Sequence, residues 1–248
     1  MIFSIFEQFE IFKIISFEIF GIDMSFTNSS LFLLLSLLFF VWLFIANIKN
    51  GYITPTRWQS IIEMAYETIY GAAKDNIGKK AGKYLPFVFS LLMFIVILNT
   101  FGVVPYTFAP TAHLALAFGL SISIFIAVTL LGIINHGFNY FSMFMPAGCP
   151  MVLAPMIVVI EIISHAVKGL SLGIRLAANI TAGHILLAIL SGFAWNMLIA
   201  GGFIAVLSVF PMFIVAFITV LEIAVAFIQV YVFSLLTAFY ISESENLH

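Results

Sequence analysis

Long runs of apolar residues, separated by short polar segments, dominate the sequence from residue 31 onward. Hydrophobic residues make up 63% of the chain and charged residues only 8%, whereas a soluble domain carries about 25% charged residues. So few polar groups could not cover the surface of a soluble domain. A membrane β-barrel would alternate polar and apolar residues over roughly ten positions, which these continuous runs do not do. The sequence therefore predicts an all-α polytopic membrane protein.

The apolar runs predict about five membrane helices within a single membrane domain, residues 1–248. The expected spans, in chain order, are 31–48, 85–104, 114–134, 156–199 and 213–241. The second and third form a helical hairpin. An unbroken helix over 156–199 would measure about 66 Å at 1.5 Å per residue, whereas the apolar core of a bilayer is about 30 Å thick. This helix therefore either breaks, at Gly169 or Gly192, or crosses at a steep tilt.

Six of the nine basic residues fall within residues 49–83, after the first expected span. Because lysine and arginine accumulate on the inner side of membranes, this segment is expected to face the matrix or the cytoplasm, and the N-terminus the opposite side. An odd number of spans then returns the acidic tail, residues 243–248, to the inner side.

Residues 55–73, inside this basic segment, are expected to form an amphipathic helix that lies along the membrane surface. A plain solvated loop is the alternative. Thr54 or Thr56 can cap the start of the helix. Its apolar stripe consists of Ile61, Ile62, Ala65, Ile69 and Ala72.

Six ionisable side chains lie inside the long apolar stretches, where a charge costs at least ~2.5–3.5 kcal/mol, so they are functional candidates by default. They are Glu161, His165, Lys168, Arg175, His184 and Glu222. The first acid, the lysine and the arginine follow one another at intervals of seven residues, so they drift only about 20° per step around a helix. Ser171 and Asn179 lie beside this stripe, and Gln229 follows Glu222 by seven residues.

The chemistry of these groups divides by pKa. Arginine stays protonated, with a pKa above about 12, so Arg175 can supply only fixed charge and hydrogen-bond donors. Histidine and glutamate can exchange protons near neutral pH once their surroundings shift them. One fixed cation beside separate titratable groups suits a proton path with an electrostatic barrier in its middle.

Several of these residues also allow purely structural interpretations. Glu161 could be a buried ion-pair partner of Lys168, and His165 is more readily a packed residue between helices than a proton relay. His113 and His136 stand at span ends, where an interfacial position is expected. Gly169 and Gly173 form a GxxxG pattern, which usually permits close helix packing.

The sequence gives no support to several other functions. No Walker A pattern is present, so nucleotide binding is not expected and the chain is not expected to be an enzyme by itself. The net charge of −2 does not suggest nucleic acid as a partner. The single cysteine, Cys149, excludes an internal disulfide and a Cys-rich metal site. No pair of histidines sits at matched depth on one face, so no cofactor and no metal are expected.

The segment Ser171–His184, which reads SLGIRLAANITAGH, closely resembles the core motif of subunit a of F-type ATP synthases. That family carries the pattern S-L-x-x-R-L-x-x-N-x-x-A-G, followed by His or Glu. The residues 7–10, 104–113 and 146–150 also resemble family segments, as does the helix that carries Glu222 and Gln229. The resemblance therefore covers most of the chain, and residues 7–10 resemble the N-terminal segment of mitochondrial members.

The resemblance implies a role for each matching residue. Arg175 would be the fixed cation that faces a rotor ring of c subunits, attracts a deprotonated ring carboxylate and keeps two proton half-channels apart. His184 and Glu222 would line the outer half-channel, and Glu161 the inner one. Asn179 and Gln229 would give polar support near the arginine. His165 and Lys168 remain candidates from their position alone.

The resemblance also implies the wider setting of the chain. The segments 156–199 and 213–241 would form a long, steeply tilted hairpin. The partners would be the c-subunit ring, the peripheral stalk and other subunits of the membrane sector, lipids and protons. Many bacterial members carry Glu where His184 stands and His where Glu222 stands. The exchange keeps one acid and one imidazole, which favours their proximity.

The N-terminal segment bears on location. Four acids and one lysine lie within residues 1–23, whereas a mitochondrial transit peptide is rich in arginine and poor in acids. Synthesis inside the compartment that uses the protein is therefore expected, with the mitochondrial inner membrane as the predicted location and a bacterial plasma membrane as the alternative. An ion-coupled secondary transporter and a non-catalytic scaffold of a respiratory complex remain alternative functions.

Overall fold

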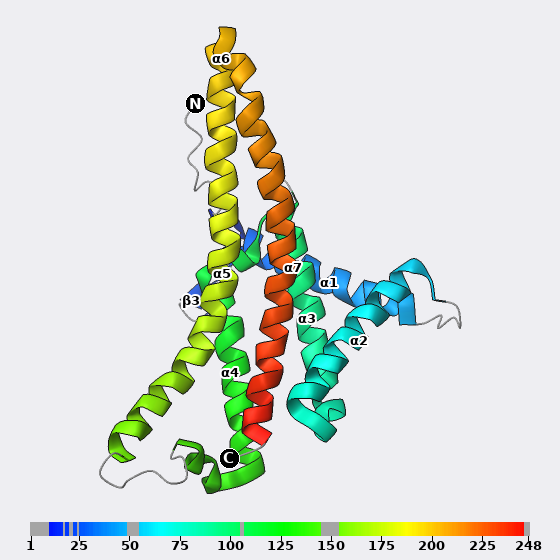
Figure 1. Ribbon diagram of the computed structural model, residues 1–248, viewed down its shortest axis with the longest axis vertical. Coiled ribbons are helices and arrows are strands. Elements are labelled where there is room, and N and C mark those ends of the chain that lie inside the picture. The colour runs from blue at the N-terminus through cyan, green and yellow to red at the C-terminus, as the bar shows by residue number, and fades with distance from the viewer. Residues whose placement is uncertain are drawn as a thin grey trace. The chain divides into compact units, whose positions relative to one another are not determined.

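The computed structural model describes residues 10–16, 18, 19, 22, 23, 25–48, 55–104, 107–144 and 154–245 (Figure 1). The α-helices are α1 (Asn28–Ile48), α2 (Arg57–Ile77), α3 (Ala81–Val103), α4 (Leu114–His136), α5 (Ala154–Ala200), α6 (Gly202–Leu207) and α7 (Val209–Glu245). Short 3₁₀ helices are η2 (Gly78–Lys80), η3 (Pro110–Ala112) and η4 (Gly137–Phe144). Within the described residues, 5 helical segments are long and apolar enough to cross a membrane. The predicted all-α polytopic class is confirmed.

The segment before the first span contains short strands, which the sequence analysis did not predict. Strand β1 (Lys13–Ile15) pairs antiparallel with β4 (Phe26–Thr27), and β2 (Glu18–Ile19) pairs antiparallel with β3 (Ile22–Asp23). Helix α1 follows directly, because the Thr27 hydroxyl accepts from the backbone N–H of Ser30 at 3.4 Å. This side chain caps the helix and explains why α1 begins at Asn28 rather than at residue 31.

Helix α2 begins at the expected cap, since the Thr56 hydroxyl accepts from the backbone N–H of Gln59 at 3.4 Å. Thr54, the other expected cap, lies outside the described residues. The buried side of α2 consists of Ile69, Ala73 and Ile77. Ile61, which was expected in the apolar stripe, is 58% exposed. The helix ends at Gly78, whose positive φ of 72° suits glycine and whose N–H bonds the Lys74 carbonyl.

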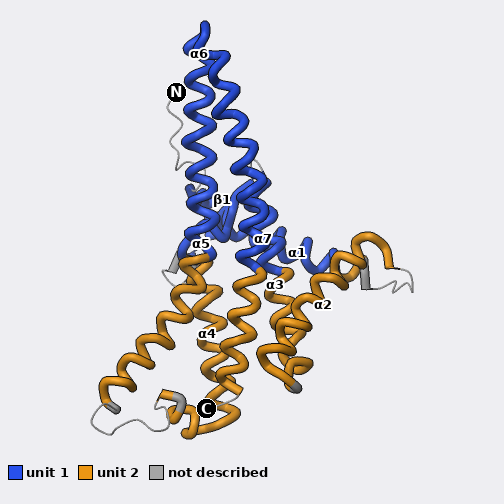
Figure 2. The backbone as a smooth tube through the Cα atoms, viewed as in Figure 1, with its two compact units in different colours: residues 1–43, 94–114, 176–230 blue, residues 44–93, 115–175, 231–248 orange. Residues whose placement is uncertain are grey.

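The chain divides into two compact units (Figure 2). Unit 1 comprises residues 1–43, 94–114 and 176–230, and unit 2 comprises 44–93, 115–175 and 231–248. Unit 1 buries a small apolar cluster that consists of Ala109, Ala112, Ile180 and Ala226. The hydroxyl of Thr181 on α5 donates to the Ala112 carbonyl at 2.9 Å, which ties α5 to the loop before α4. The expectation of one membrane domain stays a prediction.

Unit 2 is held together in part by close contact between α4 and α5. A Cβ added at Gly173 would lie 2.4 Å from the Ser121 hydroxyl, and one added at Gly169 would lie 2.8 Å from Cγ of Phe125. Both separations are far below contact distance, so these glycines permit the approach of the helices. The predicted packing role of the GxxxG pattern is confirmed.

The length of the segment 156–199 left open whether its helix breaks at a glycine. Helix α5 is a single α-helix of 47 residues and continues through both Gly169 and Gly192. The alternative in which this helix breaks at one of these glycines is therefore wrong. The helix ends before Gly201 and Gly202, which have φ values of 70° and 60° and open a turn that other residues would strain.

Candidate functional site

In unit 1, α5 and α7 bring an imidazole and a carboxylate together. Nε2 of His184 lies 3.9 Å from Oε1 of Glu222, and their side chains are 17% and 6% exposed. This separation is too long for a direct hydrogen bond. Neither carboxylate oxygen of Glu222 has a hydrogen-bond partner among the described residues. The imidazole and the carboxylate are therefore neighbours without a direct hydrogen bond, and the acid is not held by other donors among the described residues.

Gly183 is a functional candidate that the sequence analysis missed. A Cβ at this position would lie 2.6 Å from Oε1 of Glu222 and 2.9 Å from its Cδ. The backbone of α5 can therefore pass the carboxylate only because residue 183 has no side chain. The available signal was its place in the motif, directly before His184. Gly102 of α3 provides a further neighbour, because its backbone hydrogen-bonds to the His184 ring.

Gln229 and Asn179 also belong to unit 1. Gln229 is 7% exposed, and its Nε2 has no hydrogen-bond partner among the described residues. It lies two turns beyond Glu222 on α7, so both project from nearly the same face. Asn179 on α5 is partly exposed. The helix α7 thus carries two buried polar side chains with unused hydrogen-bonding capacity.

In unit 2, Lys168 forms its ion pair with Glu243 and not with Glu161. The Lys168 ammonium donates to both carboxylate oxygens of Glu243, at 2.8 and 2.9 Å. Each side chain of this pair is 25% exposed. Glu161 is partly exposed and makes no ion pair with any other described residue. The interpretation of Glu161 as the ion-pair partner of Lys168 is therefore wrong.

Glu243 is a second residue that the sequence analysis missed, since it was counted only with the acidic tail. It follows Gln229 by fourteen residues, that is, two further intervals of seven. The same spacing that placed Glu222 and Gln229 on one face therefore extends to Glu243. This continued periodicity was the signal that could have identified it.

Two histidines outside the acid pair, His113 and His165, are packed against aromatic rings. His165 lies 4.9 Å from the Phe125 ring and 5.8 Å from the Phe144 ring, and its Nε2 is 3.5 Å from the Tyr140 hydroxyl. These contacts agree with its interpretation as a residue packed between helices. His113 stacks on Phe108 at 5.0 Å, and burial lowers the pKa of its imidazole.

Arg175 differs from the other intramembrane charges because it is exposed and makes no ion pair with any described residue. It lies on α5 seven residues after Lys168. Tyr240 of α7 is within electrostatic range of its guanidinium. The arrangement leaves a fixed cation on an outer face of the helix, where a partner could reach it.

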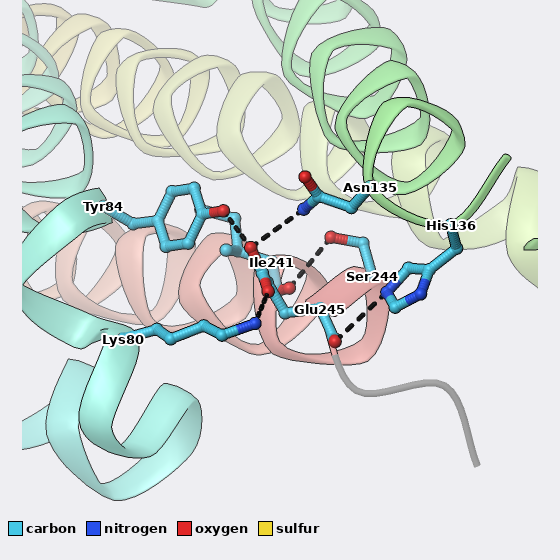
Figure 3. A network of polar contacts seen from close by, with 7 residues as sticks. All are labelled: Lys80, Tyr84, Asn135, His136, Ile241, Ser244 and Glu245. Atoms are coloured by element: carbon cyan, nitrogen blue, oxygen red, sulfur yellow. Dashed lines mark hydrogen bonds and ion pairs between the residues drawn. The ribbon is translucent and has the colours of Figure 1, made fainter.

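A further polar cluster gathers around Glu245 at the end of α7 (Figure 3). Lys80 Nζ lies 2.5 Å from Oε2, while the Tyr84 hydroxyl and the Asn135 amide, the latter at 2.9 Å, donate to Oε1. Nε2 of His136 is 3.2 Å from the backbone carbonyl of the same glutamate. The Glu245 side chain is only 3% exposed. This carboxylate ties the end of α7 to η2, α3 and α4.

Metal ligation was tested on the same part of the chain. Within the described residues, no three side chains of His, Cys, Asp or Glu come together as metal ligands would. The whole segment 146–150 that resembles the family, Cys149 included, lies outside these residues, as do residues 7–9 of the N-terminal segment and residues 105 and 106.

Sequence similarity to known proteins covers 98% of this chain and is not limited to the motif around Arg175. Residues 29–242 match the family described as ATP synthase A chain. ATP synthase subunit a of Metridium senile is 44% identical over 243 residues, which cover 98% of each chain. The subunit a of Chondrus crispus is 41% identical over 242 residues, which cover 98% of this chain and 96% of its own. That of Rhodospirillum rubrum is 41% identical over 242 residues, which cover 98% of each chain.

Proposed function

Because this chain belongs to the ATP synthase A chain family, we propose that its two groups of intramembrane charges form the two ends of a proton path separated by Arg175. The chain is a multi-pass, proton-translocating stator subunit of the membrane sector of an F-type ATP synthase. Each charge that crosses the membrane potential supplies about 2.3 kcal/mol per 100 mV. This assignment replaces the alternatives of an ion-coupled transporter and a respiratory scaffold.

His184 and Glu222 form the outer half-channel in this proposal. The observation that carries it is their 3.9 Å separation in a buried setting, with no hydrogen bond fixing either oxygen of Glu222 among the described residues. A carboxylate that is not held by donors can take up and release a proton, and an imidazole 3.9 Å away can pass one to it through a single bridging water. Because Gly183 has no side chain, the Glu222 carboxylate has room beside α5.

Arg175 provides the barrier. It cannot release its proton under physiological conditions, and it has no counter-ion among the described residues. An exposed cation on a membrane helix is costly unless an anion from another chain faces it. We assign that anion to a carboxylate on the ring of c subunits. Asn179 and Gln229 supply polar contacts near this meeting point.

Glu161 lines the inner half-channel, and Lys168 with Glu243 lies beside it. Glu161 is partly exposed and not tied up in an ion pair with another described residue, so it can exchange protons with an aqueous cavity. Lys168 and Glu243 neutralise each other and keep the local field small. Protons that leave the ring would pass Glu161 toward the inner side, which the basic segment 49–83 marks.

The complex and its location follow from the same assignment. The chain would contact the c ring, the peripheral stalk and other membrane subunits, and bind no nucleotide and no metal. We place it in the mitochondrial inner membrane, with a bacterial plasma membrane as the alternative. Fractionation of the source cells, followed by detection of the chain with the inner-membrane markers, distinguishes these locations.

Replacing Arg175 tests the proposal most directly. We expect Arg175→Ala to abolish ATP-driven proton pumping in proteoliposomes of the intact complex, because the ring carboxylate then has no cation to meet. Co-purification with the c ring checks that the complex assembles. Arg57→Ala on α2, an exposed arginine outside the spans, is the matched control and should pump normally. Normal coupling in assembled Arg175→Ala complexes would refute the assignment.

A further inference from the structure

A pocket of about 330 Å³ lies between α3 and α7 in unit 1. Its floor is made of buried side chains, among them Asn99 at 1% exposure and Val230. Its rim is made of exposed apolar side chains, which are Val104, Ile223 and Phe227. The volume falls at the lower end of the range for small-molecule sites, about 300–1,000 Å³. Because the rim is apolar and exposed, a molecule dissolved in the bilayer can enter from the side.

Asn99 stands out on this floor because its amide is buried without a partner. Neither Nδ2 nor Oδ1 has a hydrogen-bond partner among the described residues. Burying such a group without a compensating hydrogen bond is unfavourable. The two threonines of the pocket do not hydrogen-bond to Asn99. The Thr100 hydroxyl donates to the Val96 carbonyl at 2.7 Å, and the Thr219 hydroxyl donates to the Val215 carbonyl at 2.9 Å. The pocket therefore offers one amide, a donor beside an acceptor, on an otherwise apolar wall.

Water alone fits this pocket poorly. A buried water typically needs about three hydrogen bonds, and its share of volume is about 30 Å³. The pocket has room for roughly ten such volumes, whereas a single amide can bond only a few waters. The lining thus favours an occupant that is mostly apolar and carries one small polar group.

We propose that this pocket binds an uncharged single-chain amphiphile whose head carries a hydrogen-bond donor beside an acceptor. A primary fatty amide and a protonated fatty acid share this chemistry. Either head can form two parallel hydrogen bonds with Asn99, donating to Oδ1 and accepting from Nδ2. The tail then lies along the apolar wall between α3 and α7 and leaves past the rim toward the lipid.

Photolabelling of the intact ATP synthase in proteoliposomes tests this inference. The probes are dodecanamide and dodecanoic acid that carry a diazirine in the tail, with the matching methyl ester, which lacks a donor, as the control. We expect the amide, the acid or both to label the segments 96–104 and 219–230, and the ester to label them about tenfold less. That factor corresponds to losing about one net hydrogen bond. Which probe labels more strongly distinguishes the two heads.

Two variants separate recognition of the head from the shape of the pocket. Asn99→Leu should lower amide and acid labelling about tenfold, to the level of the ester. Ile223→Trp fills the rim and should remove labelling by all probes. Ile133→Trp on α4, which is also exposed but does not line the pocket, should label like the wild type. Co-purification with the complex verifies that each variant folds.

Three results would overturn the proposal. Equal labelling by ester and amide would mean that Asn99 does not recognise the head. Unchanged labelling in Ile223→Trp would place the probes elsewhere. Absence of label at both segments, together with reduced proton conduction in Asn99→Leu, would assign the amide to water in the proton path. None of these results depends on the roles proposed for Arg175, so the two hypotheses fail separately.

Discussion

Glu222 in unit 1 and Glu245 in unit 2 are buried to a similar degree, at 7% and 6% exposure, but in opposite chemical settings. Glu245 accepts hydrogen bonds from Lys80, Tyr84 and Asn135. Glu222 accepts none among the described residues, and His184 approaches it only to 3.9 Å. A carboxylate held by several donors is committed to its charged form, whereas one without donors can exchange its proton. Burial therefore does not distinguish a structural acid from a proton carrier; the surrounding donors do.

The largest effect on proton flux is expected when Glu222 is replaced by a side chain that cannot bind and release a proton. Glu222→Gln keeps the shape of the side chain but cannot carry a proton. Passive proton flux through the membrane sector should fall by about 100-fold or more, the range that a positioned proton-transfer group contributes. Fluorescent pH measurement in vesicles stripped of the soluble sector gives this rate. Glu245→Gln is the matched control, and an equal loss there would break the comparison.

A smaller loss of flux is expected from crowding Glu222. Gly183→Ala adds a Cβ within 3 Å of the carboxylate, so either α5 or the glutamate must shift. Overpacking of this kind costs about 1–3 kcal/mol, and we expect proton flux to fall roughly tenfold. Gly192→Ala on the same helix is the control, because nothing lies within 4 Å of the added Cβ. Equal flux in both variants would show that the fit around Glu222 does not matter.

Stability rather than flux should respond to Glu245. Glu245→Ala leaves the buried Tyr84 hydroxyl without its acceptor, at a cost of about 1–3 kcal/mol. Thermal unfolding of the assembled complex, followed by hydrogen exchange at the end of α7, measures this change. Glu63→Ala on α2 removes an exposed contact with Gln59 and should cost at most about 0.5 kcal/mol. If both variants unfold alike, the cluster is not structural.

The smallest expected effect is that of pH on the stability of the end of α7. The hydrogen bond from Lys80 to Glu245 raises the pKa of the lysine above its usual value. The stabilising contribution of a raised lysine pKa is fully present below the unfolded value and is lost only as pH rises through the folded one. The protection of the backbone amides at the end of α7, that is, their exchange rate relative to the intrinsic rate at each pH, should therefore stay constant between about pH 6 and pH 9, well below the usual lysine pKa of about 10.4. A marked change in that interval would contradict the assignment.

The periodicity of the sequence predicted part of the candidate site and missed the rest. Intervals of seven placed Glu161, Lys168 and Arg175 on one face of α5, because an α-helix returns to nearly the same face after two turns. They could not show that Lys168 would choose Glu243 over Glu161. Both acids are compatible with the lysine by charge, and the choice depends on which helix packs against it. A pattern along one helix contains no information about its neighbour.

The sequence by itself determined the class of the protein, its five apolar segments, and the motif around Arg175. Hydropathy and charge act locally, so a run of apolar residues in a bilayer has few alternatives to a helix. Only the tertiary structure decided that Gly183 faces Glu222 and that Asn99 is buried, without a partner among the described residues, beside a pocket. These facts depend on distances between segments far apart in the chain. Packing sets such distances, and no single segment encodes them.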